Sequence, residues 1–401
     1  MIYQDLAQSV RDAAAHLFDE LVAIRRHLHQ HPELSFEEKK TGQFIARKLA
    51  SWGIRHTTGW AGHGVVGLIE GQHPGPVLAL RADIDALPIR ETSDRPYRSK
   101  TEGVMHACGH DVHATCLLGA AHILWAHRTQ LRGSVKLIFQ PGEEKLPGGA
   151  SLMIKEGVLE RPAPTAILGQ HVHPPLEVGK VGFREGMYMA SADEIYLTVE
   201  GKGGHGALPQ DCIDPIAIAA QLIVAIQQVV SRKGDPTIPS VLTFGKIQSD
   251  GGATNIVPQR VWLEGTFRTM DESWRAEAHH LIEQVCQHTA QMWGGQCQLR
   301  LVKGYPCLIN DPTLTQRARH LAEHYLGPEQ VVDLPIRMTA EDFAWYSQQI
   351  PACFWRLGTG NTAKGITSPV HTPTFDVDER ALEIGAGLMA FEALTLNHTP
   401  Q

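Results

Sequence analysis

Residues 135–144 read VKLIFQPGEE, and this stretch decides the fold. Its first six residues form an apolar run with the length of a buried strand, and the Pro-Gly pair that follows predicts a turn. Two adjacent carboxylates, Glu143 and Glu144, come directly after that turn. One glutamate of such a pair can bind a metal ion while its neighbour stays free to accept a proton from water. The stretch therefore indicates a metal-dependent hydrolase.

Other candidate ligands also follow predicted strands. Asp83 and Asp85 come after a strand expected at 77–81, and His171 comes after one expected at 166–168. Cys108 and His110, in the stretch MHACGHDVH, lie just before a predicted helix. Ligands collect at the carboxyl ends of parallel strands, because the loops diverge there and leave a crevice. We expect these side chains to meet at one edge of a sheet.

The alternation of strands and helices predicts an α/β fold class. Such an order is typical of a mostly parallel sheet sandwiched by helices. Helices are expected at 5–30, 36–51, 114–126, 150–155, 312–325, 340–348 and 378–393, and strands at 77–81, 135–140, 166–168 and 352–357.

The pattern changes between residues 186 and 302. Strands are expected there at 194–200, 241–248, 261–268 and 296–302, and helices at 215–231 and 273–292. This order, β-α-β-β-α-β, is that of the ferredoxin-like unit. We therefore predict a first domain made of residues 1–185 and 303–401, which carries the candidate ligands, with an inserted α+β domain at 186–302.

Composition limits the classes of partner. The chain has 401 residues, 43% of them hydrophobic, and a net charge of −7, which fits a soluble protein of two domains. Nucleic acid and acidic membrane surfaces require clustered Lys and Arg, so a small-molecule substrate is expected instead. The seven cysteines show no disulfide spacing, and the N-terminus lacks the apolar stretch of a signal peptide. These features favour a cytoplasmic enzyme.

Each candidate also has an ordinary interpretation. Cys108 could be a small buried apolar residue, although the adjoining Gly109-His110 favours a ligand. Either His171 or the neighbouring His173 could end a strand, and the position closer to the strand favours His171. Asp83 and Asp85 could bind backbone N–H groups of their loop instead of a metal.

Eight short stretches together resemble a known family, and the likeness runs from about Arg25 to Glu379. The stretches are LRADIDALP, MHACGHDVHA, FQPGEE, GQHV, GKGGHGALP, TNIVP, MTAEDFA and SPVHTPTF. Together they resemble the aminoacylase and carboxypeptidase-type dinuclear metallopeptidase family, and the resemblance implies a zinc-peptidase-like catalytic domain with an inserted lid or dimerisation domain. The resemblance is closest to its amidohydrolase branch, which contains hippurate hydrolases, auxin-conjugate hydrolases, N-acyl-amino-acid amidohydrolases and N-acetyldiaminopimelate deacetylases.

The resemblance implies a set of metal ligands. These are Cys108, His110, Glu144, His171 and His371. Sulfur and imidazole ligands suit two divalent ions per subunit, manganese or zinc first, with cobalt or nickel as further candidates. The wider family usually has a ligating His-x-Asp motif where this chain reads Asp83-Ile-Asp85. We expect Asp85 to position a ligand, while direct metal contact by Asp83 or Asp85 stays open.

The resemblance also implies roles outside the metal ligands. Glu143 is expected to act as the general base. His205, in the glycine-rich loop GKGGHGALP, is expected to reach the active site of the neighbouring subunit. There it would stabilise the negative charge that develops on the attacked carbonyl group. Asn255 and Arg268 are expected to hold the free carboxylate of the substrate. Without the resemblance, His205 reads as a turn residue and Arg268 as part of a surface salt bridge.

The sequence thus predicts a metal-dependent amidohydrolase that cleaves the amide bond of N-acyl amino acids, such as hippurate-like or N-acetyl conjugates. A homodimer or higher homo-oligomer through the inserted domain is expected. A dipeptidase or aminoacyl peptidase of the same fold is an alternative, because a dinuclear centre does not distinguish acyl from aminoacyl groups. A catalytically silent binding homologue is the other alternative, although Glu143 beside Glu144 argues against it.

Overall fold

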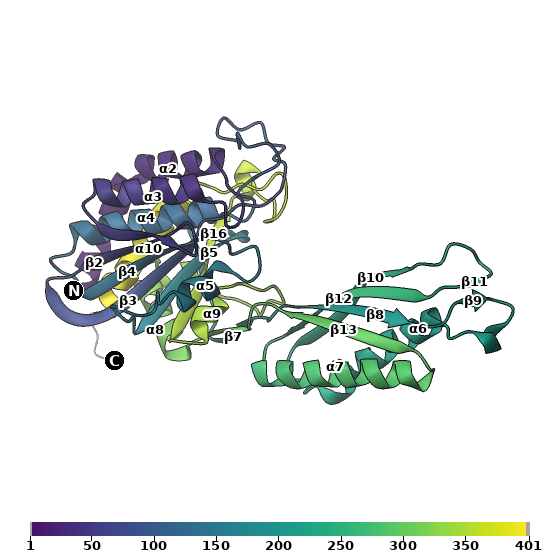
Figure 1. The fold of residues 1–401 in the computed structure, drawn as a ribbon. Helices are drawn as coiled ribbons and strands as arrows, with labels where there is room; N and C mark the ends of the chain where they lie inside the picture. Colours follow the sequence, from purple (N-terminus) through teal and green to yellow (C-terminus); the bar gives the residue numbers. More distant parts are fainter. Residues whose placement is uncertain (1, 398–401) are drawn as a thin grey trace. The chain divides into compact units, whose positions relative to one another are not determined.

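The computed structural model describes residues 2–397, and the chain divides into two compact units. Unit 1 consists of Met1–Gly186, Ile309–Pro335 and Asp342–Gln401. Unit 2 consists of Met187–Leu308 and Ile336–Glu341. Figure 1 follows the chain from unit 1 into unit 2 and back again.

An eight-stranded sheet forms the centre of unit 1. Its strands, in spatial order, are β1 (Arg55–Trp60), β2 (Gly64–Glu70), β4 (Arg132–Gln140), β3 (His73–Asp83), β5 (Ala166–Glu177), β16 (Ala352–Gly360), β6 (Val181–Phe183) and β15 (Val331–Asp333). The four central strands, from β4 to β16, are parallel, whereas β1, β2 and β6 pair antiparallel with their inner neighbours. The carboxyl ends of the central strands therefore share one edge.

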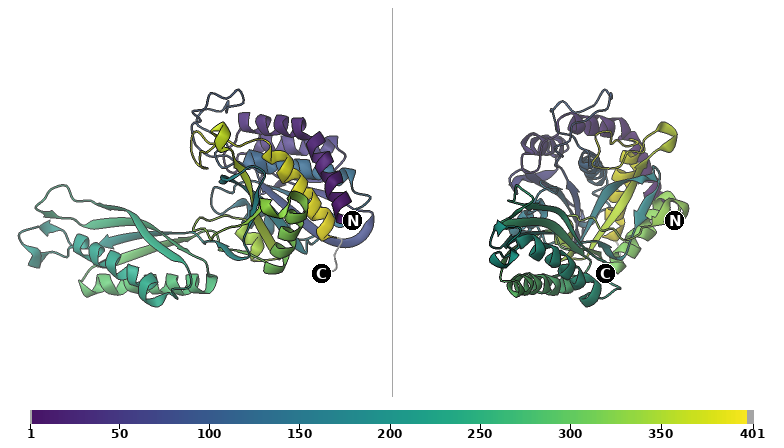
Figure 2. Two further views of the ribbon diagram at one scale, coloured as in Figure 1. Left: turned by 180° about the vertical axis from the view of Figure 1, so that it is seen from behind. Right: turned by 90° about the vertical axis from the view of Figure 1, so that its right-hand side faces the viewer.

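Helices flank this sheet on both faces (Figure 2). They are α1 (Ile2–His16), α2 (Phe18–Gln30), α3 (Lys39–Ser51), α4 (His110–Ala126), α5 (Gly149–Lys155), α8 (Pro312–Leu326), α9 (Ala344–Ser347) and α10 (Ala381–Leu396). Successive side chains of a strand point to opposite faces, and β16 shows the two layers. Trp355 joins the apolar core that contains α4 and α10, whereas Phe354 stacks on Phe343 beside α9.

Several predicted helices differ from the observed ones in their bounds, and three of them show why or how. The helix expected at 36–51 begins only at Lys39, because Phe36 has φ +68° and the carboxylate of Glu33 accepts the N–H groups of Lys40 and Thr41. The helix expected at 340–348 is reduced to Ala344–Ser347. The helix expected at 5–30 is divided into α1 and α2 at Leu17, and nothing in the structure explains that break.

Unit 2 has the predicted order of elements. These are β8 (Asp193–Glu200), α6 (Pro215–Gln228), β10 (Ser240–Ser249), β12 (Arg260–Thr269), α7 (Glu272–Met292) and β13 (Gln296–Lys303). The strands form an antiparallel sheet in the order β10-β12-β8-β13, as expected for a ferredoxin-like unit. Asp214 caps α6 by accepting the N–H of Ile216 at 2.8 Å, and both helices pack on an apolar core formed with one face of the sheet.

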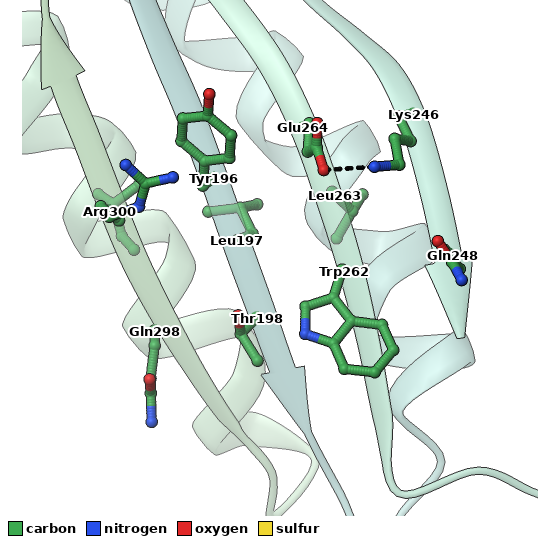
Figure 3. A pocket seen from close by; sticks show the side chains of 11 residues that line it. Tyr196, Leu197, Thr198, Lys246, Gln248, Trp262, Leu263, Glu264, Gln298 and Arg300 are labelled. Atoms are coloured by element: carbon green, nitrogen blue, oxygen red, sulfur yellow. Dashed lines mark hydrogen bonds and ion pairs between the residues drawn. The ribbon is translucent and has the colours of Figure 1, made fainter. Parts of the chain in front are cut away.

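The other face of this sheet carries polar and aromatic side chains (Figure 3). They line a shallow hollow of about 610 Å³. Lys246 Nζ lies 2.7 Å from Glu264 Oε1, and the Arg300 guanidinium lies 3.8 Å from the centre of the Tyr196 ring. The two cationic side chains that line this hollow thus have partners within it.

Short elements complete the chain. These are β7 (Gly186–Met189) paired with β14 (Leu308–Asn310), β9 (Gly204–His205) paired with β11 (Ile256–Val257), 3-10 turns at Pro209–Asp211, Pro328–Gln330 and Thr362–Lys364, and a π-helical turn at Val229–Lys233. The segment Pro215–Lys233 has the length and composition of a membrane span, with 33% of its apolar window buried. Leu222 and Ile226 of this segment lie in the core of unit 2, as in a core helix.

The boundaries of unit 2 differ somewhat from the predicted 186–302. Beyond β13, Gly304 N donates to Asp193 Oδ1 at 3.1 Å, which ties the chain to unit 2 past residue 302. The later segment Ile336–Glu341 also belongs to unit 2, because Arg337 N donates to Tyr188 O at 2.9 Å. Such returning segments carry no compositional signal in the sequence.

One fully buried cation connects distant parts of unit 1. Arg25 of α2 lies 2.9 Å from Asp111 in α4 and 2.9 Å from Asp376, which precedes α10. Its neighbour Arg26 pairs with Glu379 at 2.6 Å, but the Arg26 side chain is 43% exposed. Removing one partner from a buried ionic group leaves an uncompensated charge, whereas exposed pairs contribute little.

Replacing Arg25 by Met should therefore lower the free energy of unfolding by about 3–5 kcal/mol, because Asp111 and Asp376 lose their buried cation. The matched change Arg26→Met should cost no more than about 1 kcal/mol. Urea denaturation followed by circular dichroism measures both. Equal losses for the two variants would contradict the role assigned to Arg25.

Candidate active site

In unit 1 the candidate ligands come from the ends of β3 and β4, from within β5, which extends beyond the strand expected at 166–168, and from the start of α4. Asp83 ends β3, and its register partner Gln140 ends β4 just before the Glu143-Glu144 pair. His171 lies within β5, and His110 is the first residue of α4. Parallel register thus produces the predicted meeting of loops from distant parts of the sequence.

Gly109 lets Cys108 and His110 approach β5. Its φ is +84°, and a Cβ at this position would lie 2.6 Å from Val172 Cγ2. Both the left-handed backbone and the close approach require glycine. This explains why glycine separates the two candidate ligands in MHACGHDVH.

The structure brings all five predicted ligands together. Cys108 Sγ lies 3.4 Å from His171 Nε2 and 3.3 Å from His371 Nε2. Glu144 Oε1 lies 3.1 Å from His371 Nε2 and 4.0 Å from His110 Nε2. Ligand atoms lie within 4.8 Å of one another in three overlapping groups, which are Cys108-His110-His171, Cys108-Glu144-His371 and His110-Glu143-Glu144.

Asp85 orients the imidazole of His110. Its Oδ1 lies 3.1 Å from His110 Nδ1, and its Oδ2 accepts hydrogen bonds from Ser35 Oγ at 2.7 Å and from Glu144 N at 3.0 Å. The opposite ring atom, His110 Nε2, is buried and has no hydrogen-bond partner among the described residues. A neutral His110 would therefore present an unshared electron pair to the cluster. Both oxygens of Asp85 are therefore engaged in contacts with neighbouring residues of the site.

Asp83 has a different partner and a different effect. Val172 N donates to His113 Nε2 at 2.9 Å, so the proton of His113 is on Nδ1, which lies 2.6 Å from Asp83 Oδ1. Both nitrogens of His113 are therefore used, and it cannot bind a metal although it lies near His110. Asp83 Oδ2 accepts from Arg81 at 2.8 Å. Burial raises the pKa of Asp83, but His110, His113 and Arg81 outweigh it and lower the pKa well below its usual range.

The thiol of Cys108 requires a cation to ionise. Burial and the charge of Glu144 both raise its pKa, despite opposing contributions from His110 and His371. A buried thiolate is stable beside a metal ion, which deprotonates a coordinating thiol. His171, which is buried, uses Nδ1 in a 2.8 Å contact with Val172 O and so turns Nε2 toward Cys108. His173 belongs to none of the metal-type groups found among the described residues.

The late histidine comes from a loop after β16. His371 has φ +63°, and its backbone N–H donates to Ala107 O at 2.8 Å. Ala107 directly precedes Cys108. Hydrogen bonds with Cys108 and Glu144 raise the pKa of His371 to about 10, against the effect of burial. The site thus holds a sulfur, several imidazole nitrogens and a carboxylate. One of these nitrogens, His110 Nε2, is buried without a hydrogen-bond partner among the described residues. This donor set fits two divalent cations.

Glu143 is held beside the ligand cluster. It is 7% exposed, and its Oε1 lies 3.4 Å from Asp342 N. Asp342 is itself fixed, because it accepts from Arg81 at 2.6 Å, from Gln140 Nε2 at 2.7 Å and from Ala150 N at 3.0 Å. Asp342, Arg81 and His113 were not singled out from sequence, although all three lie within the quoted motifs.

The remaining candidates belong to unit 2. His205 is exposed and pairs with Ile256 between β9 and β11, and Asn255 O accepts from Gly206 N at 2.8 Å. A hollow of about 740 Å³ is lined by His205 and Asn255 together. Arg268 lies at the opposite end of β12, where it donates to Met338 O at 3.2 Å. Within one chain the expected pair of Asn255 and Arg268 is therefore not formed.

Comparison with known proteins identifies the family. The model of peptidase family M20/M25/M40 matches residues 79–391. The chain belongs to this family. An N-acetyl-L-cysteine deacetylase from Bacillus subtilis strain 168 is 41% identical over 93% of this chain and 87% of its own. The IAA-amino acid hydrolase ILR1-like 4 of Arabidopsis thaliana is 40% identical over 93% and 84%.

A solved structure of the M20 family extends the likeness to the whole fold. The YXEP protein of Bacillus subtilis, described as a dinuclear metal-binding peptidase, superposes with a TM-score of 0.84 at 35% identity and covers 96% of this chain and 100% of its own. The predictions of the family, of its fold class and of a hydrolase acting on amide bonds are thereby confirmed.

The role of Asp85 can be tested through metal affinity. Asp85→Asn should weaken metal binding about 10- to 100-fold, because His110 loses the carboxylate that fixes its ring. The control Asp94→Asn, at an exposed loop position, should leave affinity unchanged. Metal retained after dialysis against graded chelator concentrations measures both. An unchanged retention in Asp85→Asn would show that His110 is oriented by other contacts.

Proposed function

We propose that this M20 protein is a metal-dependent amidohydrolase that releases an amino acid and a carboxylic acid from N-acyl amino acids. One observation carries the proposal: Glu144 belongs both to the group with His110 and to the group with Cys108 and His371, whereas Glu143 joins only the first of these and its Oε1 lies 3.4 Å from Asp342 N. A hydrolase requires this division between a ligand and an unligated base. The names of the relatives, a deacetylase of an N-acetyl amino acid and an IAA-amino acid hydrolase, support the same substrate class.

Two divalent ions would be held by Cys108, His110, Glu144, His171 and His371, with manganese or zinc as the first candidates and cobalt or nickel as others. When bound, such ions polarise a carbonyl group and lower the pKa of water. The carboxylate of Glu143 accepts the proton of the attacking water. It then donates that proton to the nitrogen of the departing amine, which makes the amine a neutral leaving group.

Unit 2 carries side chains suited to binding the free carboxylate of the substrate. Arg268 presents a guanidinium, which matches a carboxylate in shape and charge, and the His205–Asn255 hollow presents an amide and an imidazole. Arg268 lies eight residues beyond Arg260 along β12, or about 26 Å at about 3.3 Å per residue. We therefore infer that a complete carboxylate site takes Arg268 from one subunit and His205 with Asn255 from its partner.

A homodimer through unit 2 accompanies this inference. On α6, Ile216 and Val224 are 47% and 65% exposed. On β10, which is the edge strand of the sheet, Val241 and Ile247 are 39% and 56% exposed. An exposed apolar helix beside an unpaired strand edge is suited to a second copy of the same surface. We also propose a cytoplasmic location, because the seven cysteines of the sequence show no disulfide spacing.

The general base is tested by two neighbouring substitutions. Glu143→Gln should lower kcat by at least about 100- to 10,000-fold without loss of metal, because the proton acceptor is removed and the ligands remain. Glu144→Gln should lose metal as well as activity. Both are assayed on N-acetyl, N-benzoyl and indoleacetyl amino acids, with metal content measured in parallel. Full turnover by Glu143→Gln would contradict the mechanism, and turnover of dipeptides alone would contradict the substrate class.

The shared site is tested by mixing two inactive variants. Glu143→Gln and His205→Ala each should lose activity, but mixed dimers contain one site with an intact Glu143 and an intact partner His205. Activity should therefore return on co-refolding or subunit exchange, to about one quarter of the native value from random pairing of equal amounts. No recovery, with mixed dimers shown by mass spectrometry, would place His205 in its own subunit's site or outside catalysis.

A further inference from the structure

The segment Glu33–Glu38, which reads ELSFEE between α2 and α3, contacts both loops that carry the site carboxylates. Toward the loop after β3, Glu33 O accepts from Ala86 N at 2.9 Å, and Leu34 forms a parallel bridge with Ala86. Ser35 Oγ donates to Asp85 Oδ2 at 2.7 Å. These contacts fix the loop whose Asp85 orients His110.

Toward the loop after β4, the contact is made by Glu38. Its side chain is fully buried, and its Oε1 accepts the N–H of Gly142 at 2.7 Å. The other oxygen, Oε2, is buried without a hydrogen-bond partner among the described residues. Gly142 is the residue directly before Glu143. A buried acidic side chain therefore accepts a hydrogen bond from the backbone next to the general base. Glu38 itself belongs to none of the ligand groups found among the described residues.

Phe36 holds the same turn from the other side. Its own φ is +68° and that of Gly142 is +63°, so both residues have a left-handed backbone. A Cβ on Gly142 would lie 2.4 Å from the Phe36 ring. A non-glycine residue in this conformation costs about 1–2 kcal/mol, which the surrounding contacts must offset. The strained residue, Phe36, is thus found where its ring packs against the turn at Gly142.

We propose that Glu38 is a positioning residue for the general base, acting through the Gly142 N–H. The inference rests on the proposed function, in which Glu143 moves the proton. Glu143 is then fixed at both ends, by Glu38 through the preceding peptide and by Asp342 N at its carboxylate. Displacing a reacting group by about 1 Å can cost a factor of about 100 in rate, so loss of one anchor is expected to affect the chemical step.

The acceptor at Glu38 does not depend on a full negative charge. Burial, followed by the charge of Asp85, raises the pKa of Glu38 to about 7. A neutral side-chain carbonyl oxygen can accept the same hydrogen bond. Glu38→Gln therefore keeps the acceptor and the shape, whereas Glu38→Met keeps the approximate volume and removes the acceptor. Glu38→Asp withdraws the carboxylate by one methylene and serves if the Met variant does not fold.

The experiment compares these variants with Glu37→Met, at the exposed neighbouring position. Glu38→Met or Glu38→Asp should lower kcat about 10- to 100-fold with KM within about twofold and metal content unchanged, because only the base is misplaced. Glu38→Gln should restore kcat to within about threefold of the native value. Glu37→Met should match the native enzyme.

A second readout is independent of catalysis. Hydrogen exchange of the peptide that contains Gly142 should accelerate at least about tenfold in Glu38→Met and stay native in Glu38→Gln. Equal kcat in the Met and Gln variants, loss of metal in parallel with activity, or unchanged exchange would each overturn the proposal. If the native protein hydrolyses no N-acyl amino acid, the proposed function fails, and the exchange measurement still decides whether Glu38 holds the turn.

Discussion

The site depends most on the buried ionic contacts of Arg25. Its guanidinium is fully buried and joins Asp111 and Asp376, each at 2.9 Å. Asp111 directly follows the candidate ligand His110, and Asp376 belongs to the segment between His371 and α10. One cation on α2 therefore connects two ligand-bearing segments that are 261 residues apart in sequence, from 110 to 371. Because a buried guanidinium is stable only when its carboxylate partners are in place, the fold cannot form its core without also bringing these segments together.

Hydrogen-bond partners also distinguish the candidate ligands from the residues that position them. Asp83 and Asp85 lie two residues apart, and each binds the Nδ1 of one histidine in the same turn region. The difference arises at the other ring nitrogen. His113 Nε2 accepts from Val172 N, whereas His110 Nε2 is buried without a hydrogen-bond partner among the described residues. A structural histidine and a candidate metal ligand thus share a motif, and the hydrogen bond from the β5 backbone distinguishes them. Arg81 extends this arrangement, since it binds both Asp83 and the Asp342 that holds Glu143.

The sequence predicted this edge of the sheet well and its supports poorly. Apolar runs that end at carboxylates or histidines indicate parallel strands, so Glu143, Glu144 and His171 could be placed before the structure was seen. Strands β1 and β2 were not predicted: β1 reads RHTTGW and is mostly exposed, so it lacks an apolar pattern. The left-handed Phe36 was read as helix, because its conformation is imposed by packing on Gly142 and not by its own preference. The role of Glu38 depends on burial, and neighbouring Glu37 has the same identity and the opposite environment.

The architecture of unit 2 places a further condition on the site. In a ferredoxin-like sheet the two ends of a strand face different surroundings. Arg268 lies near one end of β12, and the other end of β12 follows β11, which pairs with β9 through Ile256 and His205. A ten-residue strand cannot bring its own ends together, so any small substrate that contacts both sets requires a second copy of the chain. Under the proposal of a shared carboxylate site, substrate recognition depends on assembly. Association of the subunits would then complete the substrate site in addition to stabilising the fold.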